Sequence, residues 1–124
     1  MKELTKAEEQ VMQLIWEIKQ GFVKDILERI EEPKPAYNTV STIVRILEKK
    51  GFVGYIAYGK THQYYPLIAK EDYRKELMDG VVKNYFSNSF RQLVSFFAEE
   101  KKLSLKELEE LKNIVDQEII KQKK

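Results

Sequence analysis

Hydrophobic residues recur with a helical period between Pro35 and Gly51. Four of them follow the i, i+3, i+4, i+7 spacing that brings side chains onto one side of a helix: Val40, Ile43, Val44 and Leu47. The residues on the other side are polar or cationic: Asn38, Ser41, Thr42, Arg45 and Lys49. A proline before the segment and a glycine after it are typical helix boundaries. The pattern predicts a helix with an apolar inner face and a hydrogen-bonding, positively charged outer face.

Two further helices are predicted before this segment. Thr5 and Glu8 form a capping-box pattern, in which each side chain can pair with the backbone N–H of the other residue. We expect Gly21 to end the helix that follows, near the Lys19-Gln20 pair. Its apolar stripe consists of Ala7, Val11, Leu14, Ile15 and Ile18. A shorter helix fits residues 23–31 and must stop before Pro33, because a residue that precedes proline avoids the helical region.

The hydrophobic period changes after the third helix. Aromatic and β-branched residues follow one another over residues 52–58 and again over residues 61–66, with a Gly-Lys pair between the two runs. This pattern predicts a β-hairpin with Lys60 at its tip. Three helices followed by a hairpin form a winged helix-turn-helix domain, which we place at residues 1–66.

Residues 67–124 predict three more helices, over residues 70–86, over residues 89–98, and after a second capping box at Ser104 and Glu107. Their apolar side chains are too many for three short helices to bury within one chain. We therefore expect a homodimer in which these residues meet a second copy: Leu77, Val81, Phe90, Leu93, Phe97, Leu108, Leu111, Val115 and Ile119. The expected fold is mainly α with a small β wing, a winged helix-turn-helix domain followed by a C-terminal helical dimerisation arm over residues 67–124.

The net charge of +2 hides an uneven distribution. Residues 1–33 hold five Lys or Arg and eight Asp or Glu, residues 34–66 hold five and one, and residues 67–124 hold twelve and eleven. The positive charge is therefore concentrated on the third helix and the hairpin. Such a patch attracts a phosphate backbone even when the whole protein is nearly neutral, because salt screens charges beyond ~10 Å.

The outer face of the third helix suits the major groove of DNA. Short hydroxyl and amide side chains fit into the groove, and arginine can bind guanine through two hydrogen bonds. The residues that we expect to contact duplex DNA are Asn38, Thr39, Ser41, Thr42, Arg45, Lys49 and Lys60. A helix side that is merely solvated is the alternative interpretation, which the basic bias and the adjoining hairpin make the weaker one.

The composition argues against several other classes of function. Zero cysteines exclude disulfides and thiolate zinc sites, and the single histidine, His62, cannot build a multi-histidine metal centre. The sequence contains no nucleophile elbow and no glycine-rich phosphate loop. We therefore expect neither catalysis nor a metal or cofactor. No apolar run approaches the ~20 residues of a membrane span, and the chain opens without a signal peptide, so we expect a cytoplasmic protein without membrane insertion.

Several short motifs follow one another along nearly the whole chain. They are Leu4–Glu8 with Val11, Met12 and Trp16, Pro35–Val40 with Thr42, Arg45, Leu47, Lys50 and Gly51, then Gly59–Lys60, Tyr64–Pro66, Tyr85–Phe86, Ser89, Leu93–Val94 and Leu103–Ser104. In this order and spacing they resemble the BlaI/MecI penicillinase-repressor family. The resemblance implies a dimeric winged-helix repressor that occupies a pseudo-palindromic DNA operator until a signal releases it, often in operons for β-lactam resistance or copper handling.

The resemblance also implies a route of release. In several members of the family, a sensor metalloprotease pathway cuts the dimerisation arm at an Asn-Phe bond, and the equivalent bond here is Phe96–Phe97. A sensor protease is thus an expected partner, although this chain lacks the asparagine. Copper-responsive members bind metal through C-terminal cysteine pairs, which are also absent here. Two other interpretations stay open: a winged-helix regulator that senses a small ligand, and a winged helix that binds another protein.

Overall fold

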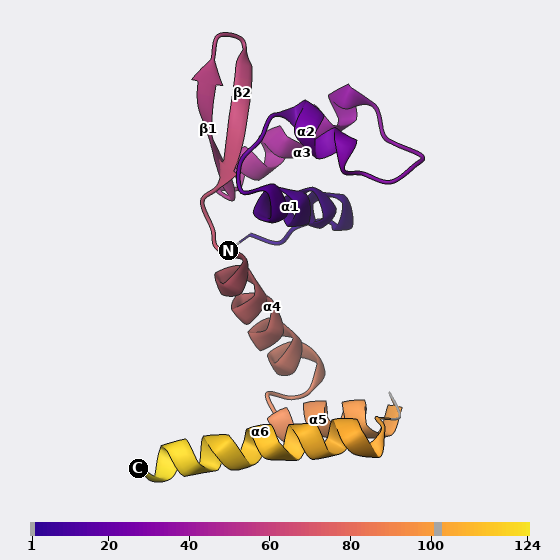
Figure 1. Cartoon of the computed structure of the whole chain (residues 1–124), viewed down its shortest axis with the longest axis vertical. Helices are drawn as coiled ribbons and strands as arrows, with labels where there is room; N and C mark the ends of the chain where they lie inside the picture. The colour runs from indigo at the N-terminus through magenta and orange to yellow at the C-terminus, as the bar shows by residue number, and fades with distance from the viewer. Residues whose placement is uncertain (1, 101–102) are drawn as a thin grey trace. The chain divides into compact units, whose positions relative to one another are not determined.

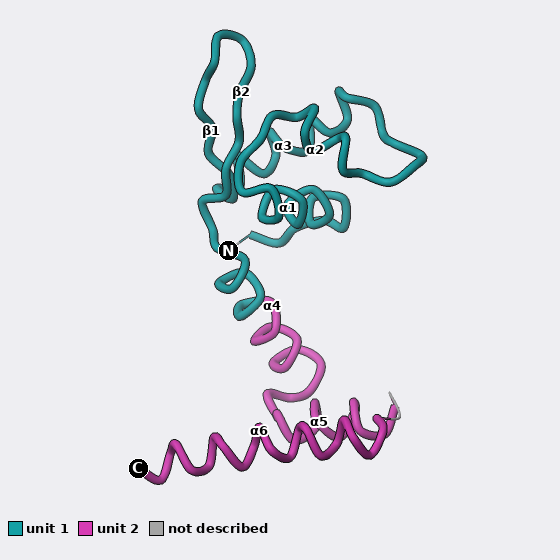
Figure 2. Tube along the Cα trace, in the orientation of Figure 1, with its two compact units in different colours: residues 1–76 teal, residues 77–124 magenta. Residues whose placement is uncertain are grey.

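The computed structural model describes residues 2–100 and 103–124. In chain order, the elements are α1 (Lys6–Ile18), α2 (Val23–Glu28), α3 (Tyr37–Lys49), β1 (Val53–Tyr58), β2 (Thr61–Pro66), α4 (Lys70–Tyr85), α5 (Phe90–Glu100) and α6 (Leu105–Lys123) (Figure 1). They fall into two compact units, residues 1–76 and 77–124 (Figure 2). Helices with one two-stranded antiparallel sheet confirm the predicted fold class. Among the described residues, no helix combines the length and the apolar character needed to cross a membrane.

The capping box predicted at the start of α1 is present. Thr5 Oγ1 accepts a hydrogen bond from the Glu8 N–H at 3.2 Å, and Glu8 Oε1 accepts one from the Thr5 N–H at 3.3 Å. The predicted end near Lys19 and Gln20 is confirmed, but Lys19, with a φ of +70°, and not Gly21 ends the helix. Gly21 serves the hairpin instead. Its N–H and C=O pair with Tyr64 at 3.0 and 2.8 Å, and an added Cβ would lie 2.7 Å from a side-chain atom of α1.

The core of unit 1 collects side chains from α1, α2, α3, both strands and the start of α4. Its members are Val11, Met12, Ile15, Val23, Ile26, Val40, Val44, Leu47, Phe52, Val53, Tyr64 and Tyr73. The apolar stripe predicted for α3 is confirmed, since Val40, Val44 and Leu47 are fully buried. Burying one such side chain stabilises the fold by about 1.5–3 kcal/mol. This stripe therefore fixes which side of α3 faces outward.

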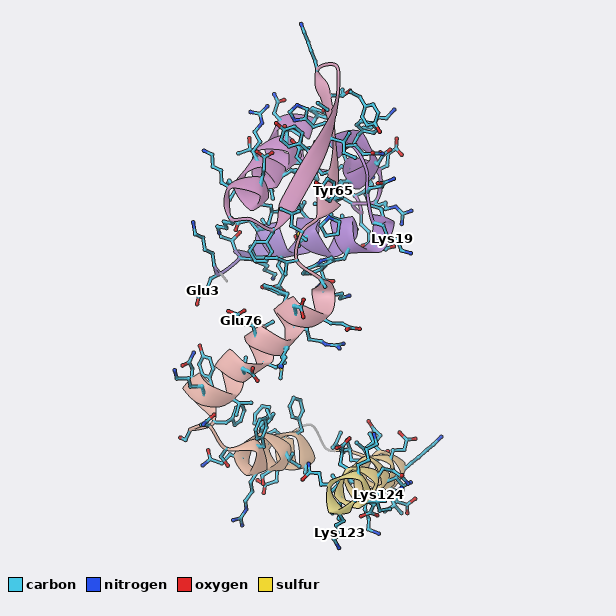
Figure 3. The ribbon with its side chains drawn as sticks, turned by 90° about the vertical axis from the view of Figure 1, so that its left-hand side faces the viewer. Glu3, Lys19, Tyr65, Glu76, Lys123 and Lys124 are labelled. Atoms are coloured by element: carbon cyan, nitrogen blue, oxygen red, sulfur yellow. The ribbon has the colours of Figure 1, made fainter. Side chains whose placement is uncertain are left out.

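An ion pair in the core region connects α1 to the end of α3. Glu8 is only 6% exposed, and its Oε1 accepts a hydrogen bond from Lys50 Nζ at 2.5 Å. Lys50 also donates to the carbonyl oxygen of Glu3 at 2.8 Å. Glu3, which is labelled in Figure 3, precedes α1 in the chain. The Lys50 ammonium holds the pKa of Glu8 below its ordinary value, although burial opposes the shift. The expectation that Ala7 faces inward is wrong: Ala7 is exposed, and the inward residue is its neighbour Glu8.

The predicted hairpin is confirmed. Its strands pair from Val53 opposite Pro66 to Tyr58 opposite Thr61. Gly59 turns the chain with a φ of +64°, a conformation that glycine adopts without strain. The Thr61 hydroxyl donates to the carbonyl oxygen of Tyr58 at 2.8 Å and stabilises the same turn. The closed end of the hairpin extends beyond the helices of unit 1 (Figure 1).

Helix α2 is shorter than the predicted range of 23–31 and ends at Glu28. The ammonium group of Lys34 explains how this early end is stabilised. It donates to the carbonyl oxygens of Leu27, Glu28 and Ile30 at 3.1, 3.0 and 2.6 Å. A helix terminus leaves such carbonyl groups without partners, and a cation there also suits the helix dipole. A lysine from the following loop therefore caps α2.

The two units divide within α4, after residue 76, whereas the sequence places the boundary after residue 66. The first turn of α4 belongs to unit 1 because of Tyr73. Its ring lies 5.6 Å from that of Trp16 and 5.7 Å from that of Phe52, measured between centroids. Its hydroxyl donates to Glu9 Oε2 at 3.0 Å. A residue that seals the core of unit 1 thus lies in a helix that continues into unit 2.

Unit 2 consists of the rest of α4, then α5 and α6. The capping box predicted for α6 is present, since Ser104 Oγ accepts from the Glu107 N–H at 3.2 Å and Glu107 Oε1 from the Ser104 N–H at 3.1 Å. Ser87 and Asn88 form the turn between α4 and α5, with φ values of +51° and +58°. Val82 is buried, but none of the described residues of α5 and α6 is.

We expect Glu8→Gln to lower the free energy of unfolding by about 2 kcal/mol at neutral pH, because it leaves the Lys50 ammonium without its anionic partner. Since folding lowers the pKa of Glu8 from 4.5, the stability from this group is present above about pH 4.5 and is lost as the pH falls through the folded-state pKa. The free energy of unfolding of the variant, measured with urea at a series of pH values, should therefore fall less steeply as the pH is lowered. Glu17→Gln, which breaks the exposed pair with Arg29, is the control and should cost less than about 0.5 kcal/mol. Equal losses in both variants would contradict the account.

A second prediction concerns alkaline pH. Burial, and then the hydrogen bond to Glu9, raise the pKa of Tyr73 from 10.0 to about 12. Folding therefore favours the protonated hydroxyl group of Tyr73. The contribution of this group to the free energy of unfolding is complete below pH 10 and is lost as the pH rises toward 12. The free energy of unfolding of Tyr73→Phe, measured by denaturant titration, should fall less steeply than that of the wild-type protein as the pH rises over this range. Tyr58→Phe removes the hydroxyl group of a residue that is 54% exposed and is the matched control. An unchanged alkaline limb in Tyr73→Phe would refute the assignment.

Candidate nucleic-acid interface

The outward side of α3 carries a line of polar and cationic residues. Asn38, Thr42, Arg45 and Lys49 follow one another at i, i+4, i+7 and i+11, so they share one side of the helix. All four are exposed. This outer face lies opposite the buried stripe, and the packing of the stripe keeps it turned to solvent.

The other two predicted residues of α3 flank this line. Thr39 is exposed on one side of it, and Ser41 is half-buried on the other. Tyr37, at the first position of α3, is 50% exposed and was not among the predicted residues. Its i, i+4 spacing from Ser41 places both residues on the same flank and could have indicated it.

The hydroxyl group of Thr42 is already engaged within the helix. Its Oγ1 donates to the carbonyl oxygen of Asn38 at 2.9 Å. The hydroxyl proton is therefore committed to the backbone, while the oxygen lone pairs and the methyl group remain for an external partner. Thr42 can accept a hydrogen bond or make an apolar contact, for example with a thymine methyl group.

The open end of α3 also suits an anionic partner. Ala36 at the N-cap makes no side-chain hydrogen bond to the helix, and no acidic residue occurs in its first turn. The amide groups and the dipole of a helix N-terminus attract negative charge. The electrostatic character of this end therefore matches that of the outer face.

The positive patch is smaller than the count of charges suggests. Of the five cations in residues 34–66, two serve the fold, because Lys34 caps α2 and Lys50 pairs with Glu8. The others are exposed, and within the described part of the chain they have no ion-pair partner: Arg45, Lys49 and Lys60. The charge available for an external anion thus lies on the outer face of α3 and at the hairpin tip.

The hairpin is joined to the helices of unit 1 through Tyr64, which pairs with Gly21. This ring is 5% exposed and packs in the core of unit 1. Burial raises the pKa of its hydroxyl, and the nearby negative charge of Glu48 adds to the shift while Arg45 opposes it. The Tyr64 face of the hairpin therefore packs on the core of unit 1. Packing places Lys60, at the tip of the hairpin, on the same domain as the outer face.

The residues predicted for dimerisation are mostly exposed in the single chain. Seven of them are at least 41% exposed: Leu77, Phe90, Phe97, Leu108, Leu111, Val115 and Ile119. Val81 and Leu93 are half-buried. On α6 the last four lie on one side, at i, i+3, i+7 and i+11. An exposed apolar stripe of this length is typical of an interaction surface.

The bond expected as a cleavage site lies inside α5. Phe96 and Phe97 are 40% and 41% exposed, and the Phe96 ring contacts Phe86 at 5.6 Å between centroids. An open hollow on this unit is lined by Tyr85, Phe86, Ser89, Arg91, Gln92, Ser95, Phe96, Glu99 and Glu100. Among the described residues, no three His, Asp or Glu side chains are grouped so that they could hold a metal ion.

Comparisons with known proteins match this chain over almost its full length. The family model described as penicillinase repressor matches residues 4–117. The methicillin resistance regulatory protein MecI of Staphylococcus aureus is 33% identical over 115 residues, which cover 92% of this chain and 94% of the relative. The penicillinase repressor of Bacillus licheniformis is 23% identical over 116 residues, covering 93% and 91%. In structure, the chain is similar to the DNA-binding domain of the repressor BlaI, with a TM-score of 0.50 and 26% identity over 59% of this chain and 94% of that one.

Proposed function

The chain belongs to the penicillinase-repressor family, and we propose that it is a homodimeric transcriptional repressor that binds a pseudo-palindromic DNA operator with the outer face of α3. One observation carries the proposal: the buried stripe of α3 holds an exposed line of polar and cationic side chains outward. A regulator of this kind is not an enzyme and acts in the cytoplasm, where bacterial DNA is.

The chemistry of the outer face supports readout in the major groove. Arg45, in the middle of the line, can bind guanine through two hydrogen bonds, and Asn38 can bind adenine in the same way. Thr42 offers a methyl group and acceptor lone pairs, since its proton is used within the helix. Lys49 at the end of α3 and Lys60 at the hairpin tip are placed to neutralise phosphates and to fix the orientation on the duplex.

The exposed stripe of unit 2 supports a dimer. A second copy would cover the leucine, valine and isoleucine side chains that one chain leaves in water. Two-fold symmetry would present two copies of α3 to DNA, with half-site centres about one helical turn or a multiple apart. A palindromic site then gains affinity from both subunits.

Release of the operator is proposed to act through unit 2. Cleavage at Phe96–Phe97 by a sensor protease would remove α6 from the DNA-binding unit, although α5 must first unfold locally for a protease to reach the bond. A small ligand in the hollow on unit 2 is the alternative inducer. Loss of DNA binding on addition of a ligand, with the chain intact, favours the ligand. Loss that accompanies a cut chain favours proteolysis.

Arg45→Ala should lose about 1–3 kcal/mol of affinity for duplexes selected from a randomised pool and should relax the preference at one base position. Lys60→Ala should weaken binding to all duplexes similarly and lower the slope of log K against log salt by about one. Fluorescence anisotropy over a salt series measures both quantities. The same response in both variants would reject the separation of roles, and wild-type protein without salt-dependent binding would favour a module that binds protein.

Leu108→Asp or Leu111→Asp should dissociate the dimer, because an unpaired charge in an apolar interface costs several kcal/mol. Gln117→Asp adds the same charge on the opposite side of α6 and should leave the dimer intact. Sedimentation velocity reports the oligomeric state of all three variants. A monomeric wild-type chain, or a dimer that survives both leucine substitutions, would contradict the proposed interface.

A further inference from the structure

The single histidine of the chain lies on the hairpin in a defined orientation. His62 stacks on Tyr55 with ring centroids 4.0 Å apart and ring planes only 8° from parallel. Cross-strand register explains the contact. Tyr55 pairs with Tyr64 and His62 with Ala57, so Tyr55 and His62 are diagonal neighbours on one face of the sheet. The stack limits the rotation of the imidazole and fixes the directions in which its ring nitrogens point.

This face of the hairpin is the one that packs on the core of unit 1. Tyr64, two residues after His62, is buried in the core and feels the charges of Glu48 and Arg45 on α3. The opposite face carries Ile56 and Tyr58, which are exposed, and the Tyr58 ring contacts Phe22 at 5.8 Å between centroids. His62 therefore lies on the same face of the hairpin as Tyr64, two residues from Lys60 at the tip.

The imidazole has capacity for an external partner. His62 is half-buried, and neither of its ring nitrogens has a hydrogen-bond partner among the described residues. The titratable groups whose rings lie beside it are Tyr55 on β1 and Tyr64 on β2, and Lys60 lies two residues earlier, in the turn. Lys60 is an exposed cation, so one phosphate of bound DNA could contact both Lys60 and His62.

We propose that His62 is a further contact of the hairpin with the DNA backbone, that Tyr55 positions it by stacking, and that the contact strengthens when the imidazole is protonated. A protonated imidazole donates from both nitrogens and carries a charge, whereas the neutral ring has only one donor. The inference rests on the proposed DNA binding and adds a residue and a pH dependence to it. Because His62 is the only histidine, one substitution removes the whole effect.

The test compares wild-type protein with His62→Phe, which keeps a flat ring on Tyr55 but removes the charge and both nitrogens. A fluorescently labelled duplex of mixed sequence is a sufficient probe, because a backbone contact does not depend on sequence. Near pH 5.5, wild-type protein should bind about three- to ten-fold more tightly than the variant, with a salt slope larger by about 0.9. Near pH 8 the two should differ by less than about two-fold.

Two further variants separate a contact from a structural effect. Tyr55→Ala should lose most of the tightening at acidic pH, and Tyr55→Phe should retain it, because the phenyl ring preserves the stack. Lys60→Ala should weaken binding by a similar factor at both pH values, since lysine stays charged over this range.

The outcomes distinguish this inference from the proposed function. Wild-type protein and His62→Phe with equal affinities and salt slopes at both pH values would overturn the inference and leave DNA binding intact. Wild-type protein that binds the duplex at neither pH, even at low salt, would overturn both. A loss in His62→Phe of the same size at both pH values would assign His62 a structural role and reject the contact.

Discussion

Burial of the apolar stripe of α3 is the interaction on which the rest of this structure depends. Val40, Val44 and Leu47 are fully removed from water, and at about 1.5–3 kcal/mol each they set the rotation of the helix about its axis. Every residue proposed to read DNA on α3 takes its orientation from this packing. A polar face of the same composition on a helix free to turn would present no fixed pattern of hydrogen-bonding groups.

Two of the five cations in residues 34–66 stabilise the fold and are not available to an external anion. Lys50 ties the end of α3 to Glu8 at the start of α1, and Lys34 closes the end of α2 just before α3 begins. Lys50 thus holds the end of α3 and Lys34 the end of α2, and neither is left for a phosphate. The remaining cations of residues 34–66 are Arg45 and Lys49 on α3 and Lys60 at the hairpin tip, and all three lie on unit 1. Structural and external roles are thus divided among residues that look alike in the sequence.

Much of this arrangement could be predicted because it depends on local patterns. Helical spacing identified α3 and its buried stripe, and capping boxes marked the starts of α1 and α6. Contacts between distant residues could not be predicted in this way. Lys34 ends α2 early, and Tyr73 draws the first turn of α4 into unit 1. The same limit applied to the site: spacing placed residues on the outer face, but only the structure showed which cations were already paired.

The most direct measurement of the central claim is an NMR titration of the isotope-labelled protein with a DNA duplex at low salt. The account predicts that the largest shifts arise from Asn38, Thr42, Arg45 and Lys49 on α3 and from the hairpin around Lys60, with small shifts on α2. Shifts confined to α6, or to the Ile56 and Tyr58 face of the hairpin, with an unchanged outer face of α3, would contradict it.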